Sequence, residues 1–73
     1  MKIKINLDTD SAAARLVGLA TGLGEKVILT DGAGMRVSAK SMLGALYAAF
    51  DFTEIWLETE NDHYLLFKEF MTE

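Results

Sequence analysis

The chain has 73 residues, a formal net charge of −4 and no cysteine, and 51% of its residues are apolar. This length forms one small domain, and without cysteine the domain has neither a disulfide nor a thiolate metal site. The acidic balance and the lack of a Lys/Arg cluster argue against nucleic-acid binding, and no apolar segment reaches the roughly 20 residues of a membrane span. We therefore expect a single, complete domain over residues 1–73 that is soluble and cytoplasmic, with no membrane or nucleic-acid partner.

The N-terminal part predicts a strand followed by a helix. Three apolar residues alternate with polar ones, as in a strand with one buried face: Ile3, Ile5 and Leu7. Any residue of the segment 8–10 can cap the helix that follows. That helix is expected over about residues 9–21, and its apolar residues recur at helical spacing: Ala13, Leu16, Val17 and Ala20.

The middle of the chain predicts a hairpin and a second helix. Residues 26–30 form an expected strand, and the glycine-containing segment Asp31–Gly34 forms a tight turn. A short strand at residues 35–37 follows. Ser38 is placed to cap a helix over about residues 40–49.

The last part predicts a strand over residues 53–59, with Ile55 and Leu57 facing inward, and a short third helix. The apolar residues assigned to that helix are Tyr64, Leu66, Phe67, Phe70 and Met71. The resulting order is βαββαβα. Because each strand buries one face, we expect an α+β open-faced sandwich, with a four-stranded antiparallel sheet and three helices on one face.

The segment from Gly34 to Gly44 carries a more specific motif. Gly34 lies in the hairpin, Val37 in the third strand, and the helix opens with Lys40-Ser41-Met42-Leu43-Gly44. In this order of elements, the motif resembles the histidine-containing phosphocarrier (HPr) family of the bacterial sugar phosphotransferase system. The resemblance implies an HPr-like sandwich, with the first and fourth strands side by side and the third at an edge. The alternative topology is a ferredoxin-like ligand-binding domain.

The chain departs from this family where the family carries its phospho-acceptor histidine. The matching position is Thr9, and no histidine, arginine or proline stands near it. Asp8 and Asp10 flank the site and would repel a phosphoryl donor. We therefore do not expect histidine phosphocarrier activity, and no residue constellation predicts other enzyme chemistry, a cofactor or a metal site. The expectation is a regulatory module that binds a protein, such as a transcription regulator or a transport-system protein.

The resemblance also singles out residues of the second helix. It implies that Ser41 is a candidate for regulatory phosphorylation, whereas the alternative is that Ser41 caps or lines the first helical turn. It implies that Met42, Leu43 and Tyr47 contact the partner. Helical spacing by itself favours a different division, with Met42 and Tyr47 exposed and three larger residues in the core: Leu43, Leu46 and Phe50.

Two further residues outside the second helix call for an interpretation. Strand alternation places Trp56 on the open face of the sheet near Ile28, where it either stacks within the monomer or marks an oligomer surface. The second reading gives the alternative function, a structural or assembly module without phosphate signalling. His63 is the sole histidine of the chain, and an ordinary surface position is expected for it.

Overall fold

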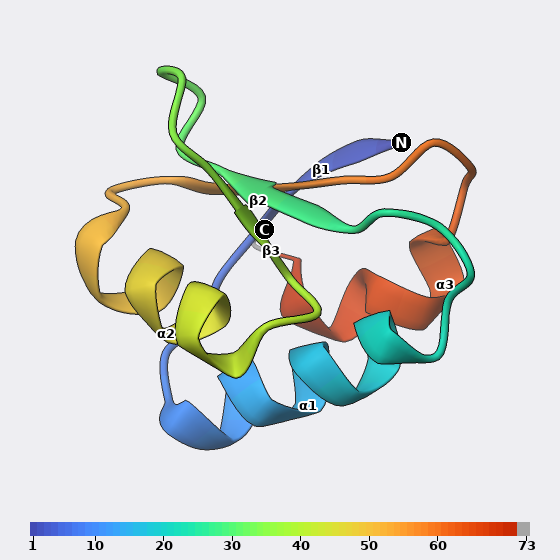
Figure 1. The fold of residues 1–73 in the computed structure, drawn as a ribbon, viewed down its shortest axis with the longest axis horizontal. Coiled ribbons are helices and arrows are strands. Elements are labelled where there is room, and N and C mark those ends of the chain that lie inside the picture. The colour runs from blue at the N-terminus through green and yellow to red at the C-terminus, as the bar shows by residue number, and fades with distance from the viewer. Residues whose placement is uncertain (72–73) are drawn as a thin grey trace.

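The chain forms one four-stranded antiparallel sheet, as a computed structural model that describes residues 1–71 shows (Figure 1). The strands are β1 (Lys2–Ile5), β2 (Ile28–Thr30), β3 (Arg36–Ser38) and β4 (Ile55–Glu58). They lie in the order β1-β4-β2-β3, so the first and fourth strands are neighbours and the third is at an edge. This order confirms the expected open-faced sandwich and excludes the ferredoxin-like alternative.

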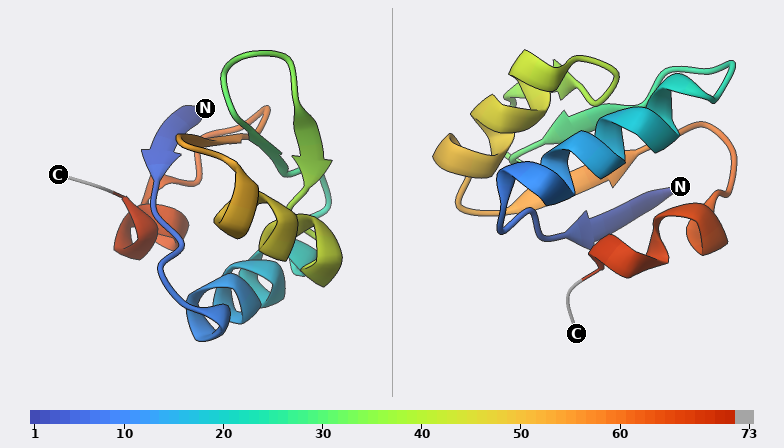
Figure 2. Two further views of the ribbon diagram at one scale, coloured as in Figure 1. Left: turned by 90° about the vertical axis from the view of Figure 1, so that its left-hand side faces the viewer. Right: turned by 90° about the horizontal axis from the view of Figure 1, so that it is seen from below.

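The helices lie together on one face of the sheet, as two further views show (Figure 2). They are α1 (Asp10–Thr21), α2 (Met42–Asp51) and α3 (Tyr64–Phe67), and a 3-10 helix, η1 (Lys68–Phe70), follows α3 directly. The predicted order βαββαβα is therefore confirmed. α1 and α2 pack against each other. Within residues 1–71, no helix has the length and apolar character needed to cross a membrane.

The core lies between the sheet and the helices. Alternate strand residues face it, and Leu29 and Leu57 are direct partners on neighbouring strands. Ile55 and Leu57 are both buried, as the alternation predicts. α1 and α2 contribute mostly small residues to this layer, whereas α3 contributes the fully buried Phe67; the residues of α1 and α2 are Ala13, Leu16, Ala20, Ala45 and Ala48. Small side chains allow helices to approach each other and the sheet closely.

The C-terminal part covers the outer edge of β1. Phe70 is buried, and its carbonyl accepts a hydrogen bond of 2.7 Å from the backbone N–H of Asn6. The sequence predicts one helix through Met71, but α3 ends at Phe67, and Met71 is extended and forms a β-bridge with Ile5. Only an extended residue can pair with a strand in this way. The bridge therefore explains why the helical segment does not include Met71.

Candidate functional site

Thr9 lies at the junction of β1 and α1. Its backbone is extended, and its Oγ1 accepts a hydrogen bond of 3.0 Å from the backbone N–H of Ala12. Thr9 is therefore the N-cap of α1, and its hydroxyl satisfies one of the N–H groups that the first turn leaves free. The prediction of a cap in this segment is confirmed.

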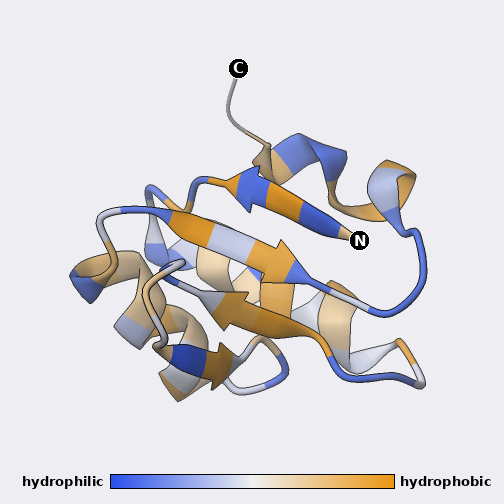
Figure 3. Cartoon of the chain, turned by 90° about the horizontal axis from the view of Figure 1, so that it is seen from above, coloured by the Kyte–Doolittle hydropathy of each residue, from blue (hydrophilic) through white to orange (hydrophobic). Residues whose placement is uncertain are grey.

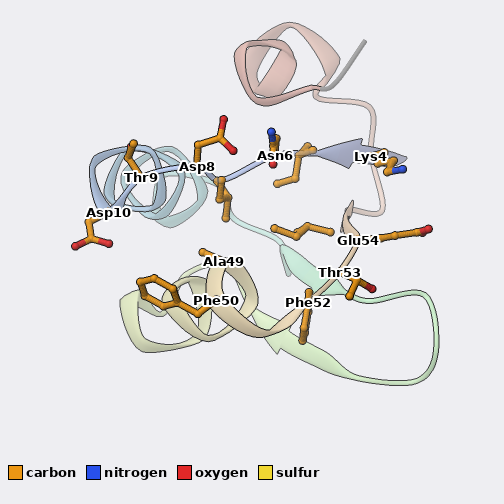
Figure 4. Close-up of a pocket in the computed structure, with 13 residues that line it drawn as sticks. Lys4, Asn6, Asp8, Thr9, Asp10, Ala49, Phe50, Phe52, Thr53 and Glu54 are labelled. Atoms are coloured by element: carbon orange, nitrogen blue, oxygen red, sulfur yellow. The ribbon is translucent and has the colours of Figure 1, made fainter.

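A hollow of about 450 Å³ lies beside Thr9, between the start of α1 and the end of α2. Figure 4 shows Phe50 on the side of Thr9 and Asp10, with Lys4 and Glu54 at the opposite end. Asp10 lies in the first turn of α1, where a carboxylate offsets the positive end of the helix dipole. A phosphoryl group added at Thr9 would meet the flanking carboxylates. Arg15 lines a second hollow with Thr9, but its guanidinium pairs with Glu69 at 3.2 Å.

Ser41 is the N-cap of α2. Its Oγ accepts a hydrogen bond of 3.2 Å from the backbone N–H of Gly44, and the residue is exposed. The prediction that Ser38 caps this helix is wrong, because the chain turns once more before the helix begins, and Ser38 Oγ instead accepts from the backbone N–H of Lys40 at 3.1 Å. The Lys40 ammonium donates to the carbonyl of Leu23 at 2.7 Å, which ties the segment before α2 to the end of α1.

Four large side chains of α2 are exposed, and we call them the α2 surface: Met42, Leu43, Tyr47 and Phe50. The exposed fractions of Leu43 and Phe50 are 80% and 76%. The spacing argument that places these two residues in the core is therefore wrong, whereas the expected exposure of Met42 and Tyr47 is confirmed. Leu46 is partly buried against the core.

The buried face of α2 is formed by Ala45 and Ala48, both fully buried. The start of the helix approaches β3 so closely that a Cβ on Gly44 would stand 2.7 Å from the carbonyl oxygen of Ser38. At this distance, only small residues fit on the face of α2 that meets β3. The larger side chains are therefore directed away from the core.

Trp56 alternates in β4 with the buried Ile55 and Leu57, so it lies on the open face of the sheet, onto which Figure 3 looks. Its indole N–H donates to Glu54 at 3.0 Å, and the Lys2 ammonium lies 5.5 Å from the ring centroid. Neighbouring charges on this face also pair within the chain, because Glu58 contacts both Lys2 and Arg36. Trp56 and Ile28 are both half-buried. The expected stacking within the monomer is thus present.

Glu25 and His63 form a contact that sequence reasoning missed. Glu25 precedes β2, and its carboxylate lies 2.9 Å from His63 Nε2. The same carboxylate accepts hydrogen bonds from the backbone N–H groups of Glu60 and Asn61 and from the Asn61 side chain. These hydrogen bonds, chiefly that of His63 and then those of Asn61, lower the pKa of Glu25 from 4.5 to about 2. His63 is therefore a partner in a contact between two loops, with 24% of its side chain exposed.

Two further results bear on the site. In the described part of the chain, no group of three or more His, Cys, Asp or Glu side chains is arranged to hold a metal ion. Comparison of the sequence with protein-family models and with curated proteins, and of the structure with solved structures, found no match.

Proposed function

We propose that this chain is a diverged, cytoplasmic HPr-like protein that has lost the phospho-acceptor histidine and acts as a regulatory module that binds a protein. The helix-two motif and the strand order β1-β4-β2-β3 support the relationship. Thr9 stands as an N-cap between two aspartates, which supports a role without phosphoryl relay. The partner is a protein such as a transcription regulator or a component of a transport system.

The observation that carries the binding role is the α2 surface. A small chain that buries alanines and exposes Leu43 and Phe50 gives up apolar burial that its own core would otherwise gain. Covering either side chain with a partner would contribute about 1.5–3 kcal/mol before the cost of association is subtracted. Exposed apolar side chains gathered on one helix are typical of a protein-binding site.

Ser41 supports regulation at the same surface. Its exposed hydroxyl lies at the N-terminus of α2, directly before Met42 and Leu43. A phosphate there would add a charge of about −1.5 to −2 at the positive end of the helix dipole, where an anion is stabilised. The added charge would adjoin the proposed contact residues, so phosphorylation of Ser41 would change partner binding through electrostatics.

The binding role is tested with immobilised protein and an extract of the source organism. We expect the immobilised wild type to capture a protein from the extract. The immobilised Leu43→Ser variant should not capture it. Leu65→Ser serves as the matched control, because Leu65 is 77% exposed but lies on α3. Equal capture by all three proteins, or loss only with Leu65→Ser, would count against the α2 surface.

The regulatory role is tested by incubation with an HPr kinase and ATP, followed by intact-mass measurement. We expect the mass of one phosphate on the wild type and none on Ser41→Ala. Absence of the mass increase, or its persistence in Ser41→Ala, would remove the regulatory part of the proposal. The binding part is tested separately by the capture experiment.

A further inference from the structure

We infer that the segment that docks on the α2 surface is cationic: an amphipathic helix of a partner protein, with apolar residues toward Leu43 and Phe50 and Lys or Arg beside them. The inference rests on the proposed binding role of the α2 surface and adds the chemistry of its occupant. It is carried by the distribution of charge around the exposed helix face.

Carboxylates line the hollow at the end of the α2 surface and follow it in sequence. Asp51 follows Phe50 directly, and the close-up of the hollow places Phe50 on the side of Asp10 (Figure 4). Asp8 lines the same hollow. Within residues 1–71, no salt bridge involves any of these three aspartates. Asp51 adjoins Phe50 in sequence, and Asp8 and Asp10 line the hollow that Phe50 also lines. Together they give this end of α2 a negative charge that is complementary to a partner that combines apolar and cationic side chains.

The backbone of α2 also contributes negative charge at this end of the helix. The last turn of a helix carries the negative end of its dipole, and no basic residue lies in the last turn of α2. The chain has no Lys or Arg at all between Lys40 and Lys68. A cation supplied by a partner would therefore compensate both the helix end and Asp51.

Cations close in sequence or space are directed to other groups. The Lys40 ammonium donates to the carbonyl of Leu23, and Arg15 pairs with Glu69 at 3.2 Å. Lys4 lies at the end of the hollow away from Phe50 (Figure 4). None of these contacts neutralises the carboxylates beside Phe50.

The shape of the surface favours a helix as the occupant. Leu43, Tyr47 and Phe50 follow one another at spacings of four and three residues, so they form a ridge along one side of α2. The ridge of one helix packs into the groove of another. The ten residues of α2 extend over about 15 Å, which matches about three turns of a partner helix lying along it.

A second copy of this chain is a poor occupant. Two copies that met through α2 would bring the same aspartates together, and each copy carries a net charge of −4. An anionic membrane surface would be repelled for the same reason. A cationic segment is the occupant that both the apolar and the charged parts of the surface favour.

The test is a selection from a displayed library of 16-residue peptides with randomised positions. Peptides are selected on the wild type and depleted on the double variant Leu43→Ser/Phe50→Ser, so that only binders of the α2 surface remain. We expect the remaining peptides to be amphipathic and to carry net positive charge. Binders that depend on α2 but are neutral or acidic would overturn the cationic inference and leave the proposed binding role intact. Recovery of no α2-dependent binder would contradict both.

The charge contribution is then measured with one recovered peptide by titration. Asp8→Asn/Asp10→Asn should weaken its Kd on the order of threefold to tenfold, since two exposed charge pairs with the peptide are lost and each has a small effect. Glu60→Gln is the matched control, because it removes one negative charge beyond the opposite end of β4, and its Kd should stay within about twofold of wild type. Equal Kd values for the double variant and wild type, or dimerisation of the wild type through α2 in light scattering, would overturn the inference.

Discussion

The carbonyl oxygen of Ser38 lies only 2.7 Å from the point where a Cβ on Gly44 would stand. This close approach joins the end of β3 to the first turn of α2. It explains why alanines form the fully buried face of the helix and why Leu43 and Phe50 are exposed. The orientation of the α2 surface therefore depends on a glycine.

Gly44→Ala should lower the free energy of unfolding by about 1–2 kcal/mol. Overpacking costs about 1–3 kcal/mol, and replacing glycine by alanine in a helix returns up to about 1 kcal/mol. Gly18→Ala in α1 is the matched control, because nothing lies within 4 Å of its added Cβ. It should stabilise the chain by about 0.5–1 kcal/mol. Urea unfolding of both variants measures these free energies. An increase in the free energy of unfolding with Gly44→Ala would contradict the close approach of Ser38.

Removal of the large α2 side chains should leave stability almost unchanged. Leu43→Ser and Phe50→Ser each alter a mostly exposed residue, so we expect changes within about 0.5 kcal/mol. Leu16→Ala, at a fully buried position of α1, should cost about 2–5 kcal/mol. Chemical denaturation gives the free energy of unfolding of each of these three variants relative to wild type. A loss of several kcal/mol with Leu43→Ser would place that residue in the core after all.

Ser41→Ala should lower stability by about 1 kcal/mol, because it removes the N-cap bond to Gly44. Ser41→Asp should keep most of that stability, since its carboxylate can accept the same bond and lies at the positive end of the helix dipole. Thermal unfolding of both variants is the measurement. A lower Tm for Ser41→Asp than for Ser41→Ala would argue that a negative charge is not tolerated at this position.

The contact between Glu25 and His63 predicts a dependence of stability on acid pH. The pKa of Glu25 is about 2 in the folded chain and 4.5 ordinarily, so between these values the unfolded state binds the extra proton. The stabilising contribution is fully present above pH 4.5 and disappears as pH falls toward 2. Glu25→Gln should have a lower free energy of unfolding than wild type at pH 6. The difference between the two proteins should become smaller as pH falls from 4.5 toward 2. Glu60→Gln, measured in parallel by urea unfolding, should show no such narrowing.

The alternative assembly role makes its own prediction at Trp56. If the open sheet face forms an oligomer, Trp56→Lys should dissociate it. Binding through the α2 surface predicts no such effect, because the Trp56 indole already has partners within the chain. Light scattering over a range of concentrations measures the molecular mass of the wild type and of Trp56→Lys in solution. A wild-type oligomer that Trp56→Lys breaks would favour assembly.

The strands and their inward residues could be predicted because alternation has a period of two and only one face of the sheet is covered. Ile55 and Leu57 illustrate this, since each lies between polar or half-buried neighbours and is buried. The start of α1 could also be predicted from the sequence, because Thr9 stands where the alternating strand pattern stops and an apolar helical pattern begins.

The orientation of α2 could not be predicted from its pattern. Alanines occupy one face and larger apolar residues another, and spacing alone assigns the larger ones to the core. The space left beneath the helix decides instead, and that space is set by β3 and α1. The contact of Glu25 with His63 could not be predicted either. It joins two loops 38 residues apart in sequence, and loops carry no periodic pattern.

The most direct test of binding through the α2 surface is the footprint of the captured partner, measured by amide hydrogen exchange. We expect slowed exchange in α2, over residues 42–51, and at the start of α1, with little change in β4. Slowed exchange confined to the strands around Trp56, with α2 unaffected, would contradict a binding site on α2.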